Sequence, residues 1–302
     1  MDDRYKKLYE EVPITCWEEL KSYSECRNLN APDDEKWSRW VFKGHESTNW
    51  ELSTTLERIL CERFGNGLSD AWRWERCLSR EFMRKARGFL HDPPSDTDYM
   101  EWLALMQHYG APTRLHDWTY SFWTAVLFAV EKAKFDNSQF CAVWALQIDW
   151  WRKCVEAKIP ILKAMLAEGS NLEPEINFIL NRQAQPDVQS GIWPLNAYRL
   201  NERVVAQRAL FVVPLDVTKS FMENLHLCSE GQQMISSHLI KFVIPCSKEI
   251  ISGCVKYLYD LNLTPATLFP GIDGYARSLG NLMLLPDRFR GIGDDRKRPW
   301  PN

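Results

Sequence analysis

The sequence has no long apolar run, no closely spaced cysteine pair and no strong charge of one sign. No stretch of the 302 residues approaches the ~20 apolar residues that a membrane-spanning helix needs, so we expect no membrane partner. The nine cysteines are an odd number without a CxxC pair, and the first residues are too charged for a signal peptide. Reduced thiols and a cytoplasmic location are therefore expected.

The net charge of −3 gives the whole chain no attraction to nucleic acid. Walker-type and dinucleotide-binding glycine motifs are absent, which excludes the common phosphate-binding loops. A local basic run lies in residues 73–87, partly offset by Glu75 and Glu81. Such a run indicates a solvated helix face more often than a nucleic-acid surface, and both interpretations stay open.

Hydrophobic patterns switch between the periods of strands and of helices. Strands are predicted at residues 37–44 (ending at Gly44), 140–149, 209–215 and 239–244. Helical patterns occupy residues 55–90, 150–182 and 247–259. The alternation predicts a mixed α/β (α+β) fold with a central mixed sheet flanked by helices. We divide the chain into an N-terminal helical cap (1–35), a main domain (36–282) and a loose tail (283–302).

The densest group of polar, rigid and aromatic residues lies in residues 101–130. Gly110 and Pro112 interrupt an apolar helical approach, because glycine permits positive φ and proline restricts the residue before it. A second helix is predicted from about Thr119, so the residues between should form a rigid loop that carries a site. The candidate binding residues of this stretch are Gln107, His108, Tyr109, Thr113, Arg114, Asp117 and Thr119.

These residue types suit an anionic ligand with a planar ring. Lys43 and Arg114 could bind a diphosphate, since lysine supplies a point charge and arginine a planar fork. The alternative is a structural ion pair between Arg114 and Asp117. His108 could transfer protons near neutral pH and could contact a ring together with Tyr109, or it could simply brace a loop. A metal site of His108, His116 and Asp117 matches no known ligand spacing, so no metal is expected.

Four separated motifs resemble the FRG-domain family of bacterial and phage proteins, which is named for a Phe-Arg-Gly triplet. The central signature is QHYGAPTRLHDWT at residues 107–119, and FKG at residues 42–44 stands in the place of the triplet. RVVAQRALF at 203–211 and TLFPGIDG at 267–274 follow in the family's order. The resemblance implies a setting in anti-phage defence or in toxin systems. Lys43 replaces the arginine of the family name.

A weaker resemblance relates the first motif to the Arg-Ser-Glu class of ADP-ribosyltransferases, and it implies a similar fold. By that resemblance Lys43 would hold phosphate, and Thr113 or Thr119 would brace the ribose. Gly44 and Arg203, in the motifs at 42–44 and 203–211, are further candidate substrate-binding residues. Gln207 would occupy the late acidic position. An amide lends no negative charge to an oxocarbenium-like transition state, so a carboxylate such as Glu202 or Asp187 would have to come close.

Three functional hypotheses follow. The first is an enzyme that cleaves NAD or transfers ADP-ribose, with Lys43, His108 and Gln207 as catalytic residues and NAD as substrate instead of cofactor. The second is a non-catalytic domain that recognises a nucleotide, a nucleic acid or a protein partner. The third is a metal nuclease that uses His108, His116 and Asp117. The first depends on one geometric prediction: residues 42–45, 108–119 and 205–211 form the walls of a single cavity.

Overall fold

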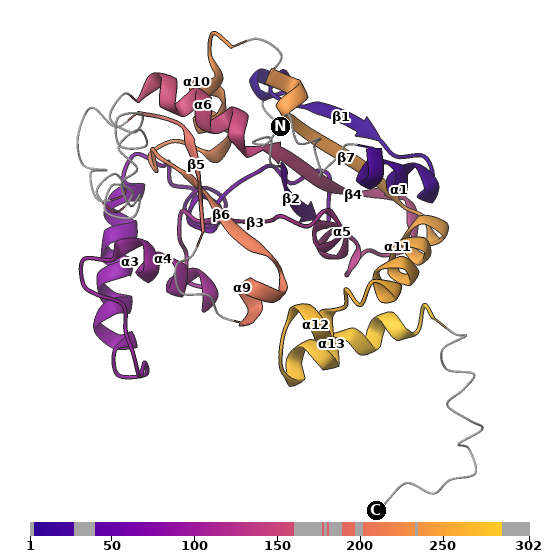
Figure 1. The fold of residues 1–302 in the computed structure, drawn as a ribbon. Helices are drawn as coiled ribbons and strands as arrows, with labels where there is room; N and C mark the ends of the chain where they lie inside the picture. Colours follow the sequence, from indigo (N-terminus) through magenta and orange to yellow (C-terminus); the bar gives the residue numbers. More distant parts are fainter. Residues whose placement is uncertain are drawn as a thin grey trace, which may run out of the picture.

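The computed structural model describes residues 3–26, 40–159, 177, 180, 189–196, 202–232 and 235–285. Its described strands form one mixed seven-stranded sheet in the order β1-β7-β4-β2-β3-β6-β5, which confirms the predicted central sheet (Figure 1). In chain order they are β1 (Glu10–Pro13), β2 (Trp40–His45), β3 (His116–Thr119), β4 (Asp136–Gln147), β5 (Ile192–Leu195), β6 (Ala209–Pro214) and β7 (Leu239–Cys246). β1 and β7 pair in parallel, and the other described pairs are antiparallel.

Helices cover both faces of this sheet, as predicted. They are α1 (Trp17–Cys26), α2 (Thr55–Arg58), α3 (Ala71–Ala86), α4 (Tyr99–His108), α5 (Phe122–Val130), α6 (Ile148–Lys158), α9 (Glu202–Ala206), α10 (Phe221–Ser229), α11 (Lys248–Asp260), α12 (Pro265–Leu268) and α13 (Ile272–Leu282). Single turns are η1 (Asp3–Tyr5), the π-helical η3 (Ile59–Arg63) and η4 (Ile235–His238). None of the described helices has the length and hydropathy needed to cross a bilayer.

Two buried clusters lie on opposite faces of the sheet. One joins Val41 of β2 and Trp144 of β4 to apolar residues of α4, α6 and α10. The other joins Phe42 and Val143 of the same strands to α1, α5 and α11. Because neighbouring strand residues point to opposite faces, β2 and β4 contribute to both cores, as expected of strands in the middle of a sheet.

Helix α5 crosses β2 directly at Gly44. A Cβ atom at this position would lie 2.0 Å from the Ala125 carbonyl oxygen and 2.7 Å from the Ala129 nitrogen. Ser121 caps the start of α5, since its side chain accepts a hydrogen bond from the Thr124 N–H. The glycine of the FKG triplet is therefore required by the close approach of a helix backbone.

Two predicted boundaries near the site are wrong. β2 does not end at Gly44 but continues to His45, and Lys43 pairs with Trp144 of β4 inside the strand. The predicted loop contains a strand, β3, in which Asp117 pairs with Phe211 and Thr119 with Phe42. The hydrogen bonds of so short a strand come from residues distant in the sequence, so local patterns could not reveal it.

Other differences concern the edges of the sheet. The N-terminal segment is more than a helical cap, because β1 adds a parallel strand to β7 with Val12 opposite Phe242. The segment predicted as a loop after residue 182 contains β5, where Pro194 is tolerated because β5 is an edge strand. Helix α6 ends at Lys158, and the rest of the helix predicted to residue 182 lies outside the described residues apart from positions 177 and 180. The predicted tail lies outside them from residue 286.

Candidate functional site

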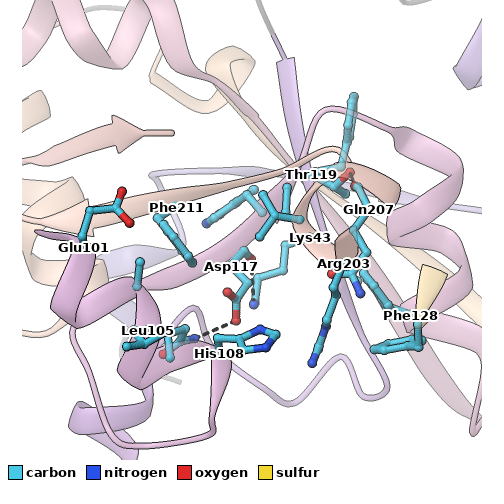
Figure 2. A pocket seen from close by; sticks show the side chains of 18 of the residues that line it. Lys43, Glu101, Leu105, His108, Asp117, Thr119, Phe128, Arg203, Gln207 and Phe211 are labelled. Carbon is cyan, nitrogen blue, oxygen red and sulfur yellow. Dashed lines mark hydrogen bonds between the residues drawn. The ribbon is translucent and has the colours of Figure 1, made fainter. Parts of the chain in front are cut away.

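A cavity of about 490 Å³ lies where the three predicted segments meet (Figure 2). The structure thus brings residues 42–45, 108–119 and 205–211 together, as predicted. The predicted site residues that line it are Lys43, Gly44, Gln107, His108, Asp117, Thr119, Arg203 and Gln207. Its volume falls within the range of about 300–1,000 Å³ that is typical of small-molecule sites.

Lys43 supplies a positive charge from the cavity wall. Its ammonium donates a hydrogen bond to the main-chain carbonyl oxygen of Asp117 at 3.0 Å. Burial lowers the pKa of Lys43 to about 8, the carboxylate of Asp117 opposes that shift, and the charge of Arg58 adds to it. Lys43 therefore keeps most of its charge at pH 7 and loses it at a lower pH than an exposed lysine does.

A chain of hydrogen bonds fixes the carboxylate of Asp117. The Leu115 N–H donates to the Thr113 hydroxyl at 3.1 Å, and that hydroxyl donates to Gln107 Oε1 at 2.6 Å. Gln107 Nε2 then donates to Asp117 Oδ2 at 2.7 Å. A carboxylate can only accept, so the amide nitrogen of Gln107 must face it, and each bond in the chain has a defined direction.

Gln207 braces the backbone around the cavity. Its side-chain Nε2 donates to the main-chain carbonyl oxygen of Leu268 at 3.0 Å, and its main-chain carbonyl oxygen accepts from the Thr119 hydroxyl at 2.7 Å. Thr119 Oγ1 also accepts from the Ser121 N–H at 3.0 Å. These bonds join β3 and the start of β6 to α12. One of the two donors on the Gln207 side-chain nitrogen is therefore used within the protein.

Two arginines stack on the ring of Phe269 at one side of the cavity. The guanidinium carbons of Arg203 and Arg277 lie 4.7 Å and 4.0 Å from the ring centroid. Arg277 is also held by Glu131, with nitrogen-to-oxygen distances of 3.0 Å and 2.7 Å. The ring of Phe128 lies edge-on to Phe269, with centroids 6.0 Å apart. The result is a wall that combines aromatic surface with positive charge.

The arginine wall also affects the imidazole of His108. Burial lowers the pKa of His108, and the charge of Arg203 lowers it further, so the ring is mainly neutral at pH 7. A second, adjoining hollow of about 510 Å³ shares His108, Arg203, Phe269 and Arg277 with the cavity. His108 thus lies at the boundary between two hollows.

Three predicted site residues do not line the cavity. Arg114 is fully buried, and its Nε lies 2.8 Å and 2.9 Å from the two carboxylate oxygens of Glu75 in α3. The predicted anion-binding pair of Lys43 and Arg114 is therefore wrong, and so is the alternative pair of Arg114 with Asp117. Tyr109 is 64% exposed on an apolar groove between α3 and α4. Thr113 is buried and reaches the cavity only through Gln107.

The three side chains of the metal hypothesis do not gather. His116 is buried against Phe221, and its Nδ1 accepts from Trp118 Nε1 at 2.8 Å. Asp117 follows it in β3 and so points to the opposite face. In the part of the chain that the structure describes, no cluster of three His, Cys, Asp or Glu residues could hold a metal ion.

Sequence reasoning did not assign Phe128, Phe269, Arg277 and Glu101 to the site, although all four line the cavity. The motif TLFPGIDG carried a signal for Phe269, because this motif belongs to the family resemblance. A Cβ at Gly274 would lie 1.8 Å from the Phe269 carbonyl oxygen, so this glycine lets α13 pack against that carbonyl. Nothing in the sequence placed Glu101 or Phe128 at the site.

Comparison with known families agrees with this anatomy. Residues 38–138 match the family model described as the FRG domain. The resemblance to the FRG-domain family is therefore confirmed for these residues. Searches of curated proteins and of solved structures gave no match. The matched segment includes β2, α4 and β3, whereas Arg203, Gln207, Phe269 and Arg277 complete the cavity from outside it.

Proposed function

We propose that the cavity binds NAD and cleaves its bond to nicotinamide, with water or a group on a protein as the acceptor of ADP-ribose. One observation carries this proposal: a cavity of ligand size is lined by two cations, Lys43 and Arg203, and by the aromatic rings of Phe128 and Phe269. An ammonium and a guanidinium group suit the two phosphates of a dinucleotide, and the aromatic side chains of the lining suit its planar bases.

The arrangement also suits the demands of the reaction. Cleavage of a glycosidic bond requires that the diphosphate is fixed, the leaving ring is held and the positive charge on the ribose is stabilised. Lys43 is fixed by the Asp117 carbonyl, and Arg203 is fixed by the ring of Phe269. Both cations are therefore pre-organised, which reduces the entropy lost when a ligand binds.

The test is the release of nicotinamide from NAD by the purified full-length protein, together with a search for ADP-ribose on added protein. We expect release, and we expect Lys43→Ala and Arg203→Ala to raise KM at least about tenfold, since each removes a charged contact worth on the order of 1.4 kcal/mol. Arg73→Ala is the matched control, because Arg73 is an exposed α3 residue that pairs with Asp70 away from the cavity. The absence of both nicotinamide release and ADP-ribosylated protein would overturn the proposal.

A second candidate function is recognition of a nucleotide without turnover. It is favoured by Gln207, whose amide nitrogen donates to the Leu268 carbonyl instead of facing a substrate. Calorimetry would distinguish the two functions: NAD binding that Arg203→Ala weakens, without any nicotinamide release, supports recognition alone. A role in bacterial anti-phage defence fits either function. It predicts that cells expressing the protein resist phage and that cells expressing Lys43→Ala do not.

A further inference from the structure

Asp117 is an acidic residue of the cavity lining with a well-defined geometry. It lies on β3 with strands on both sides, so its backbone is fixed by pairing with Phe211. Its side chain is exposed within the lining, and its Oδ2 accepts from Gln107 (Figure 2). Oδ1 has no hydrogen-bond partner among the described residues. One oxygen is therefore held while the other is directed to whatever enters the cavity.

Asp117 interacts with two cations of the cavity. Its main-chain carbonyl accepts a hydrogen bond from the ammonium of Lys43, and its charge opposes the lowering of the pKa of both Lys43 and Arg203. The side-chain amide of Gln107 donates to its carboxylate.

The support of this carboxylate extends into the core. Thr113 is fully buried, and its hydroxyl accepts from the Leu115 N–H and donates to Gln107 Oε1. The carboxylate of Asp117 can only accept, so Gln107 turns its nitrogen to Asp117 and its oxygen to Thr113. A solvated surface carboxylate needs no such buried support, so the chain Thr113–Gln107–Asp117 indicates that the position of this charge matters.

We propose that Asp117 is the catalytic carboxylate of the cavity, and that Gln107 and Thr113 are the residues that position it. This inference rests on the proposed cleavage of NAD and assigns to Asp117 the charge that Gln207 cannot supply. The bond between ribose C1′ and the nicotinamide nitrogen breaks, and its electron pair goes to that nitrogen, so neutral nicotinamide leaves. The Asp117 carboxylate stabilises the resulting oxocarbenium-like ribose through charge and a hydrogen bond from a ribose hydroxyl. The oxygen of water bonds to C1′ and gives its proton to solvent.

The first experiment compares Asp117→Asn with the unmodified full-length protein. We expect kcat for nicotinamide release to fall about 100-fold or more, while the Kd for NAD changes less than about threefold, because the charge acts mainly in the transition state. Glu249→Gln is the control, since Glu249 is an exposed α11 residue outside the cavity and its loss should leave kcat unchanged. Glu202→Gln tests the rival carboxylate beside Arg203.

The outcomes separate the two proposals. Nicotinamide release by the unmodified protein with an unchanged rate in Asp117→Asn overturns the role of Asp117 alone. The role of Asp117 is also overturned if Glu202→Gln, and not Asp117→Asn, abolishes turnover. No release by the unmodified protein overturns the proposed function and this inference together.

A second experiment tests positioning and remains decisive if Asp117→Asn fails to fold. Gln107→Glu places a second carboxylate beside Asp117, so the acidic limb of the kcat profile should move to higher pH by about one unit or more. Thr113→Val should lower kcat about tenfold, and Thr113→Ser, which keeps the hydroxyl, should restore it. A merely structural role would lower the melting temperature without moving the pH limb, and that result would overturn the positioning role.

Discussion

The ammonium of Lys43 and the main-chain carbonyl of Asp117 are joined by a hydrogen bond of 3.0 Å between neighbouring strands. The cation of the FKG triplet is thereby tied to the QHYGAPTRLHDWT signature near its end, although 74 positions separate the two residues in the sequence. Two motifs that resemble those of the family therefore act as one structural unit.

Binding at the cavity should depend on pH through Lys43. Because its pKa is lowered to about 8, the ammonium loses its charge as the pH rises from 7 to 9, and affinity for ADP-ribose should fall on the order of tenfold. Lys43→Arg keeps its charge throughout this range and should bind with little pH dependence. Calorimetric titrations with ADP-ribose at several pH values measure the affinity of the unmodified protein and of Lys43→Arg. Identical pH profiles for the two proteins would contradict the prediction.

The buried ion pair of Arg114 and Glu75 should matter for stability and not for binding. Either Arg114→Ala or Glu75→Ala leaves an unpaired charge in the core, and the free energy of unfolding should drop by about 3–5 kcal/mol. Arg203→Ala removes an exposed cation, and its effect should stay within about 1 kcal/mol. Urea denaturation measures all three. Equal losses for Arg114→Ala and Arg203→Ala would show that the buried pair is unimportant.

Gly44→Ala should destabilise the protein because its methyl group would collide with the backbone of α5. We expect a loss of at least about 2 kcal/mol in the free energy of unfolding, since either β2 or the helix must shift. Gly67→Ala is the matched control, because a Cβ there meets no atom within 4 Å. Thermal denaturation of both variants measures the contrast, and a stable Gly44→Ala protein would refute the close approach.

Glu57 should make the stability of the fold depend on pH. Its carboxyl caps α2 and accepts from the Phe221 N–H at 3.1 Å, and burial raises its pKa from 4.5 to about 7. The unfolded chain ionises Glu57 near pH 4.5 while the folded protein still holds the proton. The contribution of Glu57 to the free energy of unfolding is therefore complete below pH 4.5 and is lost as the pH rises to about 7. The loss amounts to at most about 3 kcal/mol.

Glu57→Gln should remove this part of the pH dependence, because glutamine does not titrate. Urea denaturation of both proteins from pH 4 to pH 8 gives the comparison. A glutamine variant with the same slope as the unmodified protein would assign the pH dependence to another group.

The long apolar segments of the sheet could be predicted from the sequence, and the short strands could not. β4, β6 and β7 each contain a run of consecutive apolar residues that is long enough to indicate a buried strand. β3 and β5 have only four residues each, and their formation depends on pairing with residues distant in the sequence. The convergence of residues 42–45, 108–119 and 205–211 could also be predicted, because these segments carry more polar and aromatic side chains than folding alone requires.

The partner of Arg114 could not be predicted. Glu75 belongs to the charged pattern of α3, where it looked like a surface residue that offsets neighbouring arginines, yet it is 1% exposed. Its burial follows from how α3 packs on α4, which no local period encodes. For the same reason Arg114 was assigned to the cavity together with Lys43 and Arg203, and Arg277 was not.

The sheet order has a consequence for fragments of this protein. The segment that matches the family model, residues 38–138, supplies β2 and β3 in full but only the first residues of β4. In the complete chain β4 and β6 cover the outer edges of these two strands. A fragment cut at the limits of the match would therefore expose two unpaired strand edges and would tend to self-associate. The segment that matches the family model is therefore smaller than the described sheet to which its strands belong.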